Sequence, residues 1–225
     1  MGRTFVLGDI HGAYRALVQA LERSRFDRSN DRLICLGDVA DGWPETREAI
    51  DELLTIPNLV YVMGNHDLWA AQWMETKEAE EIWLGQGGRA TCDSYVAGVP
   101  QSHVDFFKRA KPYFVENNRL FVHAGVSPGR RAEDCSDDVL FWDRTLVQMA
   151  KHHSLANTGQ HLTPYDEVFV GHTPINTHKP TKYCEVWMVD TGAAWNGELS
   201  IMDVDTKEYF TSDIVRLLYP GFKGR

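Results

Sequence analysis

The stretch FVLGDIHGAY, residues 5–14, joins an apolar run to two chemically reactive side chains. Asp9 and His11 stand two positions apart directly after the apolar residues, and an amphipathic segment follows over residues 13–24. A short apolar run bounded by glycine predicts a buried strand, and the spacing of apolar residues in the following segment predicts a helix. This stretch therefore indicates a strand, turn and helix, with a carboxylate and an imidazole in the turn.

The same order recurs twice farther along the chain. Residues 31–38, DRLICLGD, precede a helical segment at 45–54, and residues 58–65, NLVYVMGN, precede another at 66–73. Such alternation predicts parallel βαβ units and an α/β fold. Because the carboxyl ends of parallel strands meet at one edge of a sheet, we expect the polar residues of the three turns to gather there.

Strand-like runs return in the second half of the chain. They are residues 119–125 (RLFVHAG), 167–174 (EVFVGHTP), 183–192 (YCEVWMVDTG) and 198–204 (ELSIMDV). Residues 68–112 favour helices and loops, and residues 219–225, YPGFKGR, have the composition of a loose tail. Since no linker or internal repeat divides the sequence, we predict a single domain over residues 1–225.

The charge, hydropathy and cysteine pattern of the chain argue against several classes of protein. The net charge of -9 and the lack of any Lys/Arg run argue against a nucleic-acid or membrane partner. The first strand begins by about Arg3, which leaves no room for a leader, and no apolar run reaches membrane-spanning length, so a cytoplasmic protein is expected. The cysteines are scattered without a CxxC pair, which indicates reduced thiols rather than disulfides or a zinc clamp.

Eight polar side chains collect at the predicted strand ends: Asp9, His11, Asp38, Asp41, Asn65, His66, His123 and His172. Carboxylate and imidazole groups together suit manganese, iron or zinc, whereas calcium prefers oxygen ligands alone. We expect Asp9 and His11 to begin one site and Asp38, from the neighbouring strand, to bridge two metals. The second metal would then be completed by Asn65, His123 and His172.

Turn chemistry is the alternative explanation for each of these motifs taken alone. Glycine permits a tight turn, and an aspartate after it often accepts a local hydrogen bond. Five such motifs at successive strand ends, which together supply a complete ligand set for two metals, are hard to produce by turn preference. The sequence therefore favours a centre of two divalent ions, manganese first, with iron, zinc or nickel as alternatives.

In this order, GDIHG, GDVAD, GNHD, HAG and GHTP resemble the phosphoprotein phosphatase branch of the calcineurin-like metallophosphoesterases, especially small bacterial and phage-lambda-type members. The resemblance covers nearly the whole chain. It implies a two-sheet β-sandwich flanked by helices and a single catalytic domain over residues 1–225. It also implies two ligand groups: Asp9, His11 and Asp38 on one metal, and Asp38, Asn65, His123 and His172 on the other.

The resemblance further implies roles for His66 and Asp41. The histidine would donate a proton to the leaving group, and the aspartate would orient it. His66 directly follows the candidate ligand Asn65, so it should face the same cleft. An imidazolium held by a carboxylate keeps its proton until a developing alkoxide takes it. A hydroxide that bridges the metals would attack phosphorus directly, without a covalent intermediate.

Two departures from the family pattern concern phosphate binding. The family carries arginines where this chain has Gly42 and Met63. Each missing charge-assisted hydrogen bond is worth about 1.5–3 kcal/mol, so another cation has to compensate. Arg144 in FWDR corresponds to a phosphate-binding arginine of the family, and we expect it to act on the phosphate together with Asn65. A surface cation beside a core tryptophan is the alternative for Arg144, and Arg89 is a weaker candidate.

The motifs are compatible with three functions. The leading hypothesis is a phosphatase for phosphoserine and phosphothreonine in proteins, because WLGQGGRATCDSY, FWDR and GHTP resemble that branch. The first alternative is a symmetrical diadenosine tetraphosphate hydrolase, to which GNHDLW, HAGVSP and DTGAAWNG are similar. The last is a metal-binding interaction module without turnover. Partners would be a phosphoprotein or a phosphorylated small molecule, and Trp69 and Trp195 are expected to serve mainly in packing.

Overall fold

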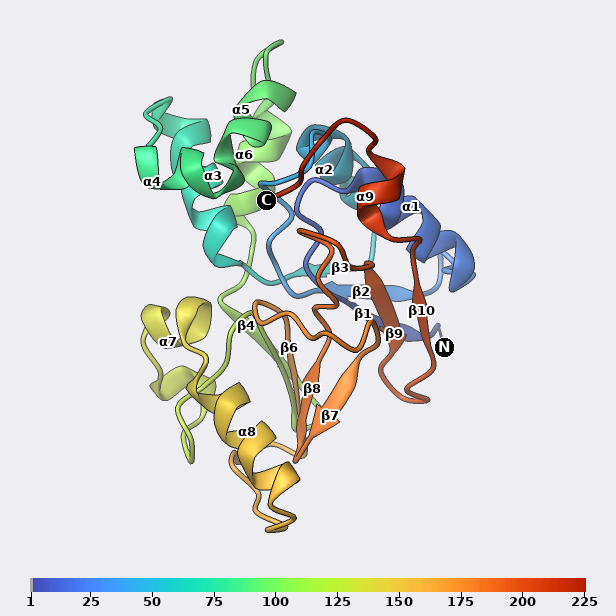
Figure 1. The fold of residues 1–225 in the computed structure, drawn as a ribbon, viewed down its shortest axis with the longest axis vertical. Helices are drawn as coiled ribbons and strands as arrows, with labels where there is room; N and C mark the ends of the chain where they lie inside the picture. Colours follow the sequence, from blue (N-terminus) through green and yellow to red (C-terminus); the bar gives the residue numbers. More distant parts are fainter. Residues whose placement is uncertain (1) are drawn as a thin grey trace.

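A computed structural model describes residues 2–225, which form two five-stranded mixed sheets with helices around them (Figure 1). The first sheet has the strand order β10-β9-β1-β2-β3. Its strands are β1 (Thr4–Leu7), β2 (Arg32–Cys35), β3 (Leu59–Tyr61), β9 (Ser200–Asp203) and β10 (Tyr209–Thr211). The strands β1, β2 and β3 are parallel, as the βαβ pattern predicts, and β9 and β10 extend the sheet in antiparallel pairs.

The second sheet has the order β4-β5-β6-β8-β7. Its strands are β4 (Tyr113–Glu116), β5 (Arg119–Val122), β6 (Glu167–Val170), β7 (Thr181–Tyr183) and β8 (Val186–Met188). The strands β5, β6 and β8 are parallel to one another, while β4 and β7 pair antiparallel at the two edges. Each sheet therefore has three consecutive parallel strands, whose carboxyl ends carry most of the motifs described above.

Helices lie in three groups around the sheets (Figure 1). They are α1 (Tyr14–Arg23), α2 (Thr46–Leu54) and α9 (Val215–Leu218); α3 (Asn65–Thr76), α4 (Glu81–Trp83), α5 (Arg89–Ser94) and α6 (Gln101–Lys108); and α7 (Asp137–Trp142) and α8 (Thr145–Leu155). A π-helical segment η1 (Leu84–Gly88) joins α4 to α5, and a 3₁₀ turn η2 (Ala132–Asp134) precedes α7. None of the helices in residues 2–225 is long and apolar enough to cross a membrane.

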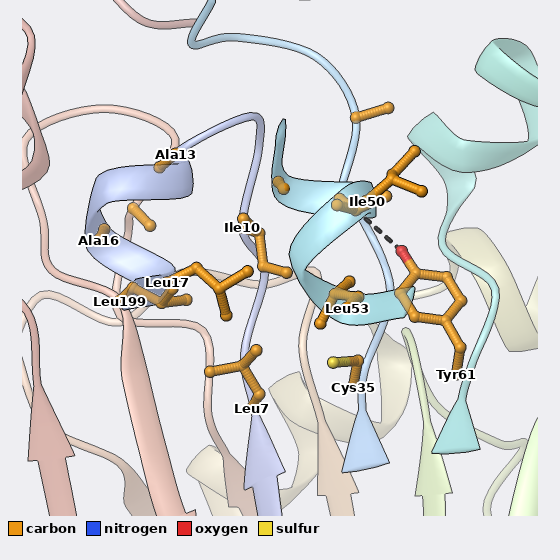
Figure 2. Close-up of a cluster of buried hydrophobic side chains, with 14 of the residues drawn as sticks. Leu7, Ile10, Ala13, Ala16, Leu17, Cys35, Ile50, Leu53, Tyr61 and Leu199 are labelled. Atoms are coloured by element: carbon orange, nitrogen blue, oxygen red, sulfur yellow. Dashed lines mark hydrogen bonds between the residues drawn. The ribbon is translucent and has the colours of Figure 1, made fainter. Parts of the chain in front are cut away.

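The first two crossover helices bury their apolar faces on the first sheet. Leu17 of α1 and Leu53 of α2 belong to one buried cluster with Leu7 and Cys35 of the strands beneath them (Figure 2). This packing explains the periodic apolar residues of both helices, because only the face toward the sheet is removed from water. The turns after β1 and β2 are thereby held in place from the helix side.

The two sheets pack against each other through a second apolar layer. This layer includes Val6 and Ile34 from the first sheet and Phe121 and Phe169 from the second. The two phenylalanine rings are stacked, with centroids 4.8 Å apart and planes 8° apart. The expected two-sheet sandwich flanked by helices is confirmed, and the shared layer sets the distance between the loops of the two sheets.

Phe169 provides a test of this layer. Because its side chain is completely buried, Phe169→Ala removes apolar contacts and leaves a cavity, so the free energy of unfolding should fall by about 3–5 kcal/mol. Urea denaturation would measure the change. Leu155→Ala is the control, because Leu155 is 84% exposed and its truncation should change stability by less than about 0.5 kcal/mol. A similar small change at Phe169 would contradict a common core between the sheets.

The prediction of one strand over residues 183–192 is wrong at its start, because β8 (Val186–Met188) lies within this run but Tyr183 belongs to a separate strand. The chain turns back at Cys184 and Glu185, so β7 and β8 form an antiparallel hairpin. Cys184 has a left-handed backbone with φ of 50°, and its N–H donates to Ser154 Oγ at 2.7 Å. Because that hydroxyl lies on α8, the turn depends on a contact distant in sequence. The edge strands β4 and β10 were also not identified in the sequence.

The prediction of a loose tail over residues 219–225 is also wrong. Tyr219 is 1% exposed, and its ring stacks on Trp43 with centroids 5.2 Å apart. At the other end of this segment, the N–H of Arg225 donates to Ala194 O at 2.9 Å. The glycine-rich composition did not reveal this packing, since the contacts are made by residues far away in the sequence. The segment runs back across the molecule toward the loops that follow β1 and β2.

Candidate functional site

The turns after five strands bring the predicted ligands into one buried cluster. Asp9 and His11 follow β1, Asp38 follows β2, Asn65 follows β3, His123 follows β5 and His172 follows β6. All six side chains are between 0 and 8% exposed. Buried carboxylates and imidazoles are costly unless they are paired or bind a metal, so the cluster requires a chemical explanation. Both sheets contribute to it.

The glycines of the motifs are required by the close approach of these loops. A Cβ on Gly64 would lie 2.1 Å from Asp38 Oδ1, and a Cβ on Gly171 would lie 2.2 Å from Asp9 Oδ1. No side chain fits at such distances, so each glycine lets a carboxylate pack against the backbone of another loop. The glycines therefore serve the tertiary contact between motifs as well as the local turn.

Two groups of donor atoms share one residue. Asp9, His11 and Asp38 form the first group, and Asp38, His123 and His172 form the second, with the ligand atoms of each group within 4.8 Å of one another. Asp38 Oδ2 lies 3.6 Å from His11 Nε2 and 3.4 Å from His123 Nε2. This oxygen is thus placed between two imidazoles, as the bridging arrangement expected from the sequence requires.

Backbone carbonyls orient the three imidazoles. The hydrogen bonds run from His11 Nδ1–H to Ala40 O (3.1 Å), from His123 Nδ1–H to Leu36 O (2.7 Å) and from His172 Nε2–H to Trp142 O (3.1 Å). Because each ring donates one N–H to a carbonyl, its other nitrogen faces the cluster and is the one that would coordinate a metal. Asn65 Oδ1 lies 2.9 Å from His123 Nε2, so the amide joins the second group.

The donor set fits a divalent cation. Asp9 Oδ2 accepts the N–H of His172 at 2.9 Å, but the buried Oδ1 has no hydrogen-bond partner in residues 2–225. Burial and the neighbouring Asp190 raise the pKa of Asp9 well above its usual range. Burial lowers the pKa of His123, yet the negative charge of Asp38 raises it overall to about 10. The cluster therefore attracts positive charge, which a metal ion would supply.

His66 and Asp41 lie in direct contact beside this cluster. His66 Nδ1 is 2.6 Å from Asp41 Oδ2, and both side chains are completely buried. His66 Nε2 has no hydrogen-bond partner within the described part of the chain. The free nitrogen and the carboxylate on the opposite side of the ring form an arrangement that can hold a proton on the imidazole for transfer.

Three supporting residues were missed in the sequence. Asp41 also accepts hydrogen bonds from Trp83 Nε1 at 2.7 Å and Thr91 Oγ1 at 2.8 Å. Asp67 accepts hydrogen bonds from Asp38 N at 2.8 Å, Val39 N at 2.9 Å, Gly64 N at 3.0 Å and the Tyr61 hydroxyl at 2.7 Å. Asp67 stands three positions after the helix cap Gly64, where an acidic residue is typical of a capping box, so the sequence did carry a signal for it. No local signal marked Trp83 or Thr91.

Arg144 lies at the start of α8, and its side chain is exposed. The carbonyl two residues earlier, Trp142 O, accepts the hydrogen bond of His172. Burial and the charge of His123 lower the pKa of His172 to about 3, and the positive charge of Arg144 contributes in the same direction. Arg144 is therefore near the second ligand group. Met63, by contrast, is half-buried and packs against the core of both sheets.

Comparisons with known proteins agree with this geometry. A family model described as calcineurin-like phosphoesterase matches residues 2–193. A symmetrical bis(5'-nucleosyl)-tetraphosphatase of Pseudomonas fluorescens SBW25 is 26% identical, with 92% of this chain and 93% of that protein covered. Serine/threonine-protein phosphatase 1 of Salmonella typhimurium is 25% identical over 88% of this chain and 89% of its own length. The crystal structure of a putative diadenosine tetraphosphatase has the same fold, with a TM-score of 0.69, 18% identity and coverage of 93% and 92% of the two chains.

Proposed function

Because the chain belongs to the calcineurin-like phosphoesterase family, we propose that its buried cluster is a two-metal centre that hydrolyses phosphomonoesters. The observation that carries this proposal is Asp38 Oδ2, which lies between the imidazoles of two ligand groups. The centre takes Asp9, His11 and Asp38 for one metal and Asp38, Asn65, His123 and His172 for the other. Since strands of both sheets carry these residues, residues 1–225 act as a single catalytic domain.

The chemistry divides between the metals and the protein. When bound, two divalent ions, with manganese as our proposal, would neutralise phosphate charge and lower the pKa of the attacking water. Asp41 holds His66 by its Nδ1, which leaves Nε2 to carry the proton that the departing alkoxide needs. Arg144 and Asn65 bind oxygens of the phosphate. Burial of the ligands excludes water from their polar groups, which strengthens these interactions.

The proposed substrate is phosphoserine or phosphothreonine in a protein. The support is the likeness to the Salmonella protein phosphatase over 88% of this chain, together with the motifs WLGQGGRATCDSY, FWDR and GHTP. A protein substrate makes contacts through the residues that flank its phosphorylated side chain. Such contacts can compensate for the arginines absent at positions 42 and 63.

A second candidate is hydrolysis of diadenosine tetraphosphate. The Pseudomonas relative carries the corresponding name, and an aromatic pair lies beside the proposed acid. Trp69 is 5.0 Å from Trp142 and 5.4 Å from His66, measured between ring centroids. Trp142 is 37% exposed, so one of its faces is available for stacking with a base.

A substrate panel separates the two candidates. For the manganese-loaded protein, we expect kcat/KM to be higher for phosphopeptides than for diadenosine tetraphosphate. If the substrate is a phosphoprotein, Trp142→Ala should change kcat/KM equally for both compounds, because no base stacks on the ring. A kcat/KM for diadenosine tetraphosphate well above that of every phosphopeptide would reverse the assignment. A loss confined to the dinucleotide in Trp142→Ala, with recovery in Trp142→Phe, would identify the stacking surface.

A further inference from the structure

A cavity of about 350 Å³ lies between the η1 and α5 region and the segment that follows α9. Its lining includes three cationic side chains, Arg89, Lys223 and Arg225, and one acidic residue, Asp93. Gly42, which directly follows the proposed positioning residue Asp41, also lines it. In a chain with a net charge of -9, a positive cavity next to the catalytic loop is unexpected and favours an anionic ligand.

Gly42 itself cannot readily carry a cationic side chain. Its φ of 105° lies in a region that side-chain-bearing residues rarely adopt. A Cβ at this position would lie 3.3 Å from His11 O and 3.5 Å from Arg225 Cβ. The space beside the loop is therefore occupied by Arg225, from the segment that the sequence indicated as a loose tail.

Three contacts hold Arg225 in this place. Its N–H donates to Ala194 O at 2.9 Å, and Nη2 donates to Gln86 Oε1 at 2.9 Å. The guanidinium carbon lies 5.4 Å from the centre of the Trp195 ring. All three partners are neutral, and Arg225 forms no ion pair with any residue in the range 2–225. A half-buried guanidinium with five N–H donors thus has most of its hydrogen-bonding capacity free.

The side chain of Arg225 begins close to the ligand cluster. An ideal Cβ on Gly42 would lie 3.5 Å from Arg225 Cβ and 3.5 Å from His11 Cβ, so both side chains border the same small space. The other two cations of the cavity, Arg89 and Lys223, have exposed side chains. Among the three, Arg225 is therefore the one placed to act at the metal centre.

We propose that Arg225 binds oxygens of the substrate phosphate and so supplies, from the far end of the chain, the cation that position 42 lacks. This inference rests on the proposed phosphoesterase function. The planar fork of arginine suits a phosphate, and the contact with Gln86 together with the ring of Trp195 keeps the fork in one orientation. Arg225 thereby joins Arg144, which lies near the opposite ligand group, in binding the phosphate.

Binding of inorganic phosphate to the manganese-loaded protein tests this assignment without turnover. By calorimetry, Arg225→Ala should raise the Kd for phosphate about tenfold, the loss expected for one charge-assisted contact. Arg225→Lys keeps the charge but not the fork, so its Kd should lie between those of Arg225→Ala and the wild type. Arg109→Ala, which removes an exposed arginine at the end of α6, is the matched control and should leave the Kd unchanged.

The outcomes also separate this inference from the proposed function. A Kd for Arg225→Ala within twofold of the wild type, or no measurable phosphate binding by the wild type, would overturn the role of Arg225. Hydrolysis of phosphoesters by the wild type would stand in either case. Conversely, a wild type that hydrolyses no phosphoester would contradict the proposed function, while a tenfold loss of phosphate affinity in Arg225→Ala would still establish the anion site. Thermal unfolding of each variant checks that the fold is retained.

Discussion

Asp38→Asn is expected to abolish hydrolysis and to remove metal from both positions of the centre. The reason is geometric, since Asp38 Oδ2 lies within 3.6 Å of His11 Nε2 and 3.4 Å of His123 Nε2. An asparagine has nearly the same shape and can still accept the hydrogen bond that His66 N donates to Oδ1 at 2.9 Å. It lacks the negative charge that would hold both cations of the proposed centre, so kcat/KM should fall at least about 10³-fold.

The measurement is metal content after loading with manganese and desalting, together with phosphatase activity. The wild type should retain two ions, lose all activity in a chelator and recover it with manganese, whereas Asp38→Asn should not recover. Asp166→Asn is the matched control, because Asp166 is exposed and lies outside the ligand cluster. Full activity of the wild type in the chelator would end the two-metal proposal.

His66→Asn is expected to retain both metals but to lower kcat on alkyl phosphates by about 10²–10⁴-fold, the usual contribution of a general acid. His66 is not in either ligand group, and its Nδ1 is engaged by Asp41 at 2.6 Å. The loss should be smaller on aryl phosphates, whose leaving groups depart without a proton. The ratio of the two losses therefore reports proton transfer, whereas a general structural defect would lower both rates alike.

His103→Asn is a suitable control for this experiment. His103 is also completely buried and contacts a carboxylate, with its Nε2 2.9 Å from Asp51 Oδ1, but it lies on α6 outside the ligand cluster. Its replacement should leave the ratio between alkyl and aryl phosphates unchanged. Equal losses on the two substrate types in His66→Asn would argue against His66 as the acid.

The positions of the candidate ligands were predictable because each of them closely follows a strand. Each motif pairs an apolar run with a glycine and a polar residue, and parallel strands place such residues at a common edge. The ligand cluster of Asp9, Asp38, His123 and their neighbours follows from this rule and from the metal preference of carboxylate and imidazole groups. The alternation of strands and helices likewise predicted the parallel order of β1, β2 and β3.

The sequence by itself thus indicated the candidate ligands and the parallel strand order, because each is encoded in a short periodic or motif pattern. The resemblance of those motifs implied the two-sheet architecture and the pairing of His66 with Asp41. Only the tertiary structure decided what supports and extends the site: the hydrogen bonds of Trp83 and Thr91 to Asp41, and the place of Arg225 beside Gly42. Arg225 lies 183 positions after Gly42 in the sequence. A contact across such a separation depends on the packing of Tyr219 against Trp43 and of Arg225 against Ala194, and no local propensity records it.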